Sequence, residues 1–109
     1  MAGGLSYTAL ESPELSTAEI YGQTLVDLGR EHKEIVGLSA DLAGSTKIGV
    51  FGKEFPDRFF NVGIAEQNMF GMAAGMAKAG LVPFVSTFST FASLRSADQI
   101  HTDICYQNV

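Results

Sequence analysis

The stretch that decides the fold is residues 58–69, with the sequence RFFNVGIAEQNM. Its apolar run over residues 59–64 predicts a strand. Residues 66–78 then predict a strong helix, which ends at an Ala-Gly pair. Glu66 therefore stands at the junction between a predicted strand and a predicted helix.

Helices and strands also alternate on both sides of this stretch. Ser16 and Glu19 have the spacing of a capping box, and apolar residues at three- and four-residue spacing predict a helix over residues 17–32. Two further apolar runs, over residues 35–40 and 82–87, are typical of buried strands.

The connecting segments complete the predicted order. Residues 42–53 are rich in Gly, Ser and Thr and predict a loop with one short helical turn, and residues 91–106 predict a final helix. Strands that alternate with helices at these lengths indicate an α/β fold, with a parallel sheet and helical crossovers. A further strand is expected after the last helix, so we expect the sheet to be incomplete. Residues 1–15 are expected to form a flexible N-terminal leader.

The composition excludes several classes of protein. The 109 residues are 46% hydrophobic and 17% charged, which is typical of a packed globule. The net charge of -5 argues against nucleic-acid binding, and no apolar run is long enough to cross a membrane. A single cysteine excludes an internal disulfide and favours a reducing cytoplasm, and no residues have metal-ligand spacing.

Position in the predicted sheet selects candidate ligand-binding residues. In open parallel sheets, ligands bind at the carboxyl ends of the strands, which selects Asp41, residues 65–68 and residues 88–91. Each has a structural alternative. A carboxylate such as Glu66 stabilises a helix start by about 0.3–1 kcal/mol, an Asp after a strand often caps a turn, and aromatic side chains often belong to a core.

Three other residues are expected to serve packing and to have no chemical role. Gly71 and Gly75 lie four apart on one predicted helix and indicate a close-packing face. Cys105 has no neighbouring His and is expected to be a small buried residue in the last helix.

Residues 58–69 strongly resemble the signature of the transketolase family. Residues 37–42 upstream, and residues 83–91 and 98–100 downstream, agree with the family in order and spacing. The resemblance covers about residues 16–109. It implies the N-terminal part of the pyrimidine-binding domain of thiamine diphosphate enzymes.

The resemblance assigns the central role to Glu66. In the family, a glutamate hydrogen-bonds N1′ of the cofactor's aminopyrimidine and favours the imino tautomer, which acts as the internal base toward C2 of the thiazolium ring. A glutamine could donate or accept a hydrogen bond there but could not exchange the proton. Phe88 and Phe91 match the family's aromatic residues that pack around the aminopyrimidine.

Other positions follow from the same resemblance. Asp41 and Leu42 match a family Asp-Leu pair close to the cofactor, and Ile64 is expected to end the second strand beside it. Leu94 stands where some members have a third aromatic residue. Arg95 lies on a helix near the family's subunit interface and is assigned no chemistry.

The resemblance also implies a partner. In the family, a second domain holds the diphosphate through Mg²⁺ and a Gly-Asp-Gly motif, and this sequence has no such motif. We therefore expect thiamine diphosphate to be shared with a diphosphate-binding N-terminal section or subunit, Mg²⁺ to be bound by that partner, and a homo- or hetero-oligomer to form. The chain alone is not expected to be active.

Several functions stay open at this point. The leading prediction is part of a transketolase, which transfers a two-carbon ketol unit between sugar phosphates. A fragment of 1-deoxyxylulose-5-phosphate synthase is a close alternative, and the β subunit of a 2-oxo acid dehydrogenase is a more distant one. A non-catalytic remnant that only binds a partner subunit is a fourth.

Overall fold

The computed structural model describes residues 16–109, so the predicted leader over residues 1–15 lies outside the described residues. The strands are β1 (Ile35–Ser39), β2 (Phe59–Asn61) and β3 (Val82–Ser86). The helices are α1 (Thr17–Glu31), α2 (Ala43–Thr46), α3 (Gly49–Glu54), α4 (Glu66–Lys78) and α5 (Ala97–Gln99). A 3-10 turn covers Pro56–Arg58, and π-helical turns cover Phe91–Arg95 and Ile100–Cys105.

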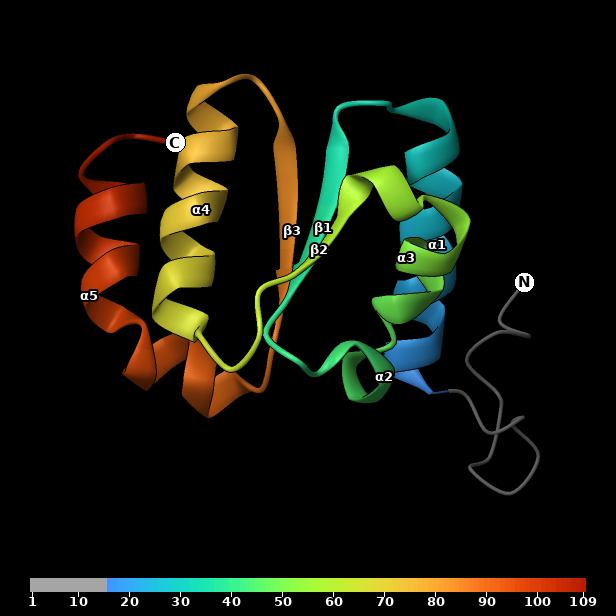
Figure 1. Cartoon of the computed structure of the whole chain (residues 1–109), viewed down its shortest axis with the longest axis horizontal. Helices are drawn as coiled ribbons and strands as arrows, with labels where there is room; N and C mark the ends of the chain where they lie inside the picture. The colour runs from blue at the N-terminus through green and yellow to red at the C-terminus, as the bar shows by residue number, and fades with distance from the viewer. Residues whose placement is uncertain (1–15) are drawn as a thin grey trace, which may run out of the picture.

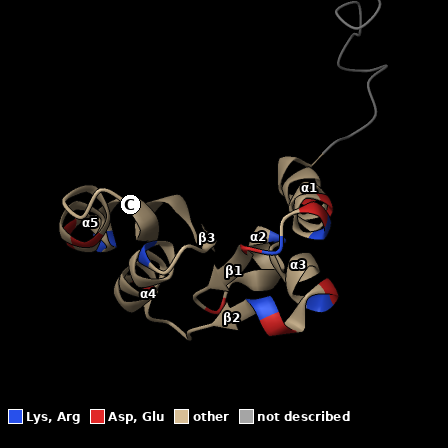
Figure 2. Ribbon diagram, turned by 90° about the horizontal axis from the view of Figure 1, so that it is seen from above, with Lys and Arg blue, Asp and Glu red and all other residues tan. Residues whose placement is uncertain are grey.

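The three strands form one parallel sheet in the order β2-β1-β3. Helices lie on both faces: α1 and α3 on one side, and α4 with the C-terminal helical segment on the other (Figures 1 and 2). The prediction of an α/β fold with a parallel sheet and helical crossovers is confirmed. Because both faces are covered, every residue of the central strand β1 is buried, which explains its continuous apolar run.

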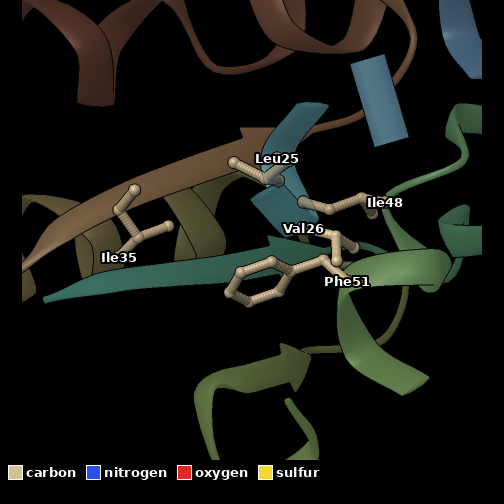
Figure 3. Packing of buried hydrophobic residues seen from close by; sticks show 5 residues of the cluster. All are labelled: Leu25, Val26, Ile35, Ile48 and Phe51. Carbon is tan, nitrogen blue, oxygen red and sulfur yellow. The ribbon is translucent and has the colours of Figure 1, made fainter. Parts of the chain in front are cut away.

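Two apolar clusters fill the space between the layers. The first joins α1, β1 and α3 through buried side chains (Figure 3): Leu25, Val26, Ile35, Ile48 and Phe51. The second joins β1 to α4, through Val36, Leu38, Ala40 and Met69. Alternate residues of β1 thus serve opposite faces, as the pleat of a strand requires.

Most predicted elements are confirmed within a residue or two. Helix α4 begins and ends where the sequence predicts, and Ser16 caps α1, because its Oγ accepts a hydrogen bond from the Glu19 N–H at 3.4 Å. Strand β2 is shorter than predicted. It ends at Asn61, and Gly63 turns the chain with φ +78°. Ile64 therefore lies in the following loop, so the prediction that it ends the strand is wrong.

Two helical segments also differ from the prediction. Residues 42–53 contain two short helices where one helical turn is predicted, because Phe51 anchors α3 in the core. The predicted helix over residues 91–106 is divided into a π-helical turn, the short helix α5 and a second π-helical turn.

The packing predictions for the glycines and the cysteine are largely wrong. Cys105 is exposed. A Cβ at Gly75 would meet no atom within 4 Å, and one at Gly71 would meet only Asp103 Oδ2 at 3.4 Å. The close approaches lie on α1 instead, where Gly22 and Gly29 are buried against neighbouring elements.

No helix within residues 16–109 is both long enough and apolar enough to span a bilayer.

Candidate functional site

The carboxyl ends of all three strands lie along one edge of the sheet, at the bottom of Figure 1. The loop after β1 leads there to α2, the loop after β2 leads to the start of α4, and β3 runs into the π-helical turn Phe91–Arg95. The three segments that the sequence selects are therefore brought to the same edge.

Glu66 is the buried acid of this edge. It is the first residue of α4, and only 3% of its surface is exposed. Met69 and Ala73, which are also buried, follow it at three- and four-residue spacing, so the carboxylate lies on the helix face that packs toward the sheet. Its position in the first turn also suits the positive end of the helix dipole.

Asn61 connects the two loops that approach Glu66. Its Oδ1 accepts hydrogen bonds from the Asp41 N–H at 2.9 Å and the Gly63 N–H at 3.2 Å, and its Nδ2 donates to Asp41 Oδ1 at 3.4 Å. Both partners have positive φ, +60° at Asp41 and +78° at Gly63. The Asn61 amide thus accepts hydrogen bonds from the backbone at both left-handed positions and links the ends of the two loops.

A pocket of about 250 Å³ opens between these loops and the π-helical turn. Five of the six residues predicted to bind the cofactor line it, together with Ala40 and Arg95: Asp41, Leu42, Ile64, Glu66 and Phe91. The pocket thus combines one buried carboxylate with a mostly apolar wall.

The sixth predicted residue, Phe88, lies beside this pocket. Its ring centroid is 5.8 Å from that of Phe91, and the ring planes are tilted by 30°. Phe88 is 46% exposed and Leu94 is 75% exposed, so neither belongs to a core. The two phenylalanine rings form an aromatic surface next to the carboxylate.

Arg95 is the residue of the pocket to which the sequence assigns no chemistry. Its Nη1 lies 3.3 Å from Glu66 Oε2, and its guanidinium carbon lies 4.0 Å from the centroid of the Phe91 ring. The Gln67 side chain donates to the Arg95 carbonyl at 3.0 Å. The four-residue offset of Phe91 and Arg95 was the available signal, because that offset brings side chains together on a helix.

A second hollow, of about 310 Å³, adjoins the first and shares Ile64, Glu66 and Arg95 with it. Within residues 16–109, no three His, Cys, Asp or Glu side chains are grouped so as to hold a metal ion. The described residues of this edge therefore present the buried carboxylate of Glu66, the exposed carboxylate of Asp41, the Arg95 guanidinium and an aromatic surface.

The family model described as "Transketolase, pyrimidine binding domain" matches residues 13–109. This chain belongs to that family. A protein of Methanocaldococcus jannaschii, whose name describes a transketolase C-terminal section, is 54% identical over 86 residues, covering 79% of this chain and 27% of its own length. The 1-deoxy-D-xylulose-5-phosphate synthase of Halothermothrix orenii is 49% identical over 92 residues, covering 84% of this chain and 14% of its own length.

A solved structure also matches this pyrimidine-binding domain. It is titled "Split gene transketolase, inactive beta4 tetramer", and it aligns with a TM-score of 0.78 and 52% sequence identity over 87% of this chain and 32% of its own. The chain thus spans about a third or less of each of these relatives. The family and the fold are those that the resemblance of residues 58–69 implies.

Proposed function

We propose that this chain supplies the pyrimidine-binding half of a transketolase active site, which transfers a two-carbon ketol unit between sugar phosphates with thiamine diphosphate. The observation that carries the proposal is the buried carboxylate of Glu66, which opens into a pocket lined by Asp41, Leu42, Ile64 and Phe91. Membership of the transketolase pyrimidine-binding family supports dependence on the cofactor.

The residues present fit the aminopyrimidine end of the cofactor. Arg95 engages Oε2 of Glu66, and among the described residues no protein donor is paired with Oε1, so this oxygen is available to a ring nitrogen. The Phe88 and Phe91 rings offer a surface for a flat heterocycle, and Leu42 and Ile64 add apolar side chains to the lining of the pocket.

The bound cofactor would supply the nucleophilic carbon that carries the ketol unit. Glu66 would hold a proton at Oε1 and exchange it with the pyrimidine ring nitrogen, which is a task for a carboxyl group in a site shielded from water. Asp41 would stay beside the cofactor, held by the Asn61 amide.

The other half of the site belongs, in this proposal, to a diphosphate-binding N-terminal section that also binds Mg²⁺. The relative named as a C-terminal section and the split-gene transketolase structure support a separate partner chain and an oligomer. The cytoplasm is the proposed location, since the one cysteine of the chain requires no oxidising compartment.

Substitution of Glu66 by glutamine tests the proposed role. In the assembly of this chain with the N-terminal section, Glu66→Gln should lower turnover by about 10²–10⁴-fold, the range for loss of a positioned acid–base group. Glu31→Gln removes an equal charge from an exposed position at the end of α1 and should leave turnover unchanged. Wild-type turnover in the Glu66→Gln assembly would refute the assignment.

Calorimetry with thiamine diphosphate and MgCl₂ separates the proposal from a non-catalytic remnant. Heat of binding that appears only when the N-terminal section is present supports a shared site. Absence of binding both with and without that section would contradict the proposal and favour a chain that only contacts its partner.

The second candidate function is a 1-deoxy-D-xylulose-5-phosphate synthase, because the synthase of Halothermothrix orenii matches 84% of this chain at 49% identity. The two activities differ in product. Formation of 1-deoxy-D-xylulose 5-phosphate by the complete assembly, in place of ketol exchange between sugar phosphates, would establish the synthase and exclude the transketolase.

A further inference from the structure

We infer that Arg95 is a positioning residue that holds the Glu66 carboxylate through Oε2 and thereby directs Oε1 into the pocket. The inference rests on the proposed function only for the identity of the ligand that Oε1 would meet. The pairing of Arg95 with Glu66 is a property of the chain itself.

The two oxygens of the Glu66 carboxylate differ in their contacts. Its Oε2 lies 3.3 Å from Arg95 Nη1, while Oε1 has no hydrogen-bond donor among the described residues. The carboxylate is 3% exposed, whereas 47% of the Arg95 side chain is exposed. Arg95 therefore reaches from the surface toward a buried charge. Among residues 16–109, it is the one basic residue that forms an ion pair with Glu66.

Arg95 is itself held in place from two sides. Its guanidinium carbon stacks 4.0 Å from the centre of the Phe91 ring, and its backbone carbonyl accepts a hydrogen bond from Gln67 Nε2 at 3.0 Å. Gln67 follows Glu66 directly in α4, so the helix that carries the acid also fixes the turn that carries the arginine. A long side chain restrained in this way can orient a neighbouring group.

The π-helical turn explains how Arg95 reaches Glu66. Residues 91–95 form a wider turn than an α-helix, and Ser96 Oγ, which is fully buried, donates to the Phe91 carbonyl at 3.1 Å. The turn thereby presents Phe91 and Arg95 together at the carboxyl end of β3. Single π-helical turns frequently occur at functional sites, where they redirect side chains.

Arg95 would act on ligand binding indirectly, by orienting Glu66. Arg95 would fix the rotamer of the carboxylate before the ligand arrives, so that less ordering is required on binding. A lysine at this position keeps the positive charge but loses the planar fork and much of the stacking on Phe91. The conservative variant should therefore restore only part of the effect.

A double-mutant cycle on the unliganded chain tests the pairing independently of any cofactor. The variants are Glu66→Gln, Arg95→Gln and the two combined, and urea denaturation gives the folding equilibrium constant of each. We expect Arg95→Gln to reduce that constant by about tenfold more in the wild type than in the Glu66→Gln background, because the buried carboxylate loses its partner only in the former. Additive effects would overturn the inference.

Calorimetry with thiamine diphosphate and MgCl₂ on the chain assembled with the N-terminal section tests the consequence for binding. Arg95→Gln should weaken affinity by about tenfold and Arg95→Lys by less. Arg30→Gln removes the same charge from an exposed pair on α1 and should have no effect. Wild-type affinity in Arg95→Gln would overturn the positioning role.

The two experiments distinguish failure of the proposed function from failure of the inference about Arg95. If the wild-type assembly does not bind thiamine diphosphate, the proposed function is refuted. The double-mutant cycle still decides whether Arg95 holds Glu66, because it uses no ligand.

Discussion

Substitution of Gly22 by alanine should destabilise the chain although alanine favours a helix. Gly22 is buried in the middle of α1 and faces the segment that follows α2. A Cβ at this position would lie 2.6 Å from the Lys47 carbonyl oxygen and 3.3 Å from Lys47 Cβ. Ordinary van der Waals contact begins at 3.4 Å, so the methyl group overlaps the backbone oxygen by about 0.8 Å.

The oxygen cannot rotate aside as a side chain would. Lys47 has φ +64°, and its carbonyl accepts a hydrogen bond from the Val50 N–H at 3.2 Å at the start of α3. Relief of the overlap therefore shifts α1 away from α3, or breaks that bond. Overpacking of this kind costs about 1–3 kcal/mol, and the gain in helix propensity on replacing glycine offsets about 1 kcal/mol.

Gly75→Ala is the matched control. Gly75 lies in the exposed part of α4, and a Cβ there would meet no atom within 4 Å. Because both substitutions replace a helical glycine, the propensity term cancels in their difference, which should equal the overpacking cost of about 1–3 kcal/mol. Gly75→Ala alone should stabilise the chain by about 1 kcal/mol.

Urea denaturation followed by far-UV circular dichroism measures the free energy of unfolding of the three proteins under one set of conditions. The expected order of stability is Gly75→Ala, then wild type, then Gly22→Ala. Equal free energies for the two variants, within about 0.5 kcal/mol, would show that the contact at Lys47 does not constrain α1.

Two further predictions concern packing and pH. Arg58 donates a hydrogen bond to the Gly29 carbonyl at 2.8 Å at the end of α1, so Arg58→Lys should lower the free energy of unfolding by about 1–3 kcal/mol. Arg30 forms an exposed pair, so Arg30→Lys should change that free energy little. Equal effects of the two substitutions would contradict this role of Arg58. Burial raises the pKa of Tyr21 above 10.0, although its 2.6 Å hydrogen bond with Ser86 lowers it in part. The folded chain therefore keeps this proton after the unfolded chain loses it, so stability is complete below about pH 10 and falls above it. Tyr21→Phe should lack that alkaline loss in denaturation measured across this pH range, and an unchanged pH profile would refute the explanation.

Local sequence determined most of the fold, because its signals act within a few residues. A capping motif marks the Ser16 cap of α1, and a continuous apolar run marks β1. The full length of α4 is marked by a helical segment that ends at a glycine. The short length of β2 could not be predicted. The strand ends where Gly63 turns the chain with φ +78°, and this turn is bonded to the Asn61 side chain, which also contacts Asp41 in another loop.

The candidate site was partly predictable for a related reason. The carboxyl ends of parallel strands meet at one edge, so Asp41, Glu66 and Phe91 could be grouped from their order in the sequence alone. The burial of Glu66 also has a sequence signal, the helical spacing to Met69 and Ala73. Their catalytic and cofactor-binding roles remain predictions.

The sequence by itself therefore determined the α/β class and the family, and it singled out Glu66 as the candidate acid. Only the tertiary structure decided what Glu66 touches. Arg95 lies 29 positions away along the chain and reaches the acid because a π-helical turn at the end of β3 faces the start of α4. Such a contact depends on the relative placement of two elements and on one turn of non-standard width, neither of which leaves a repeating pattern in the sequence.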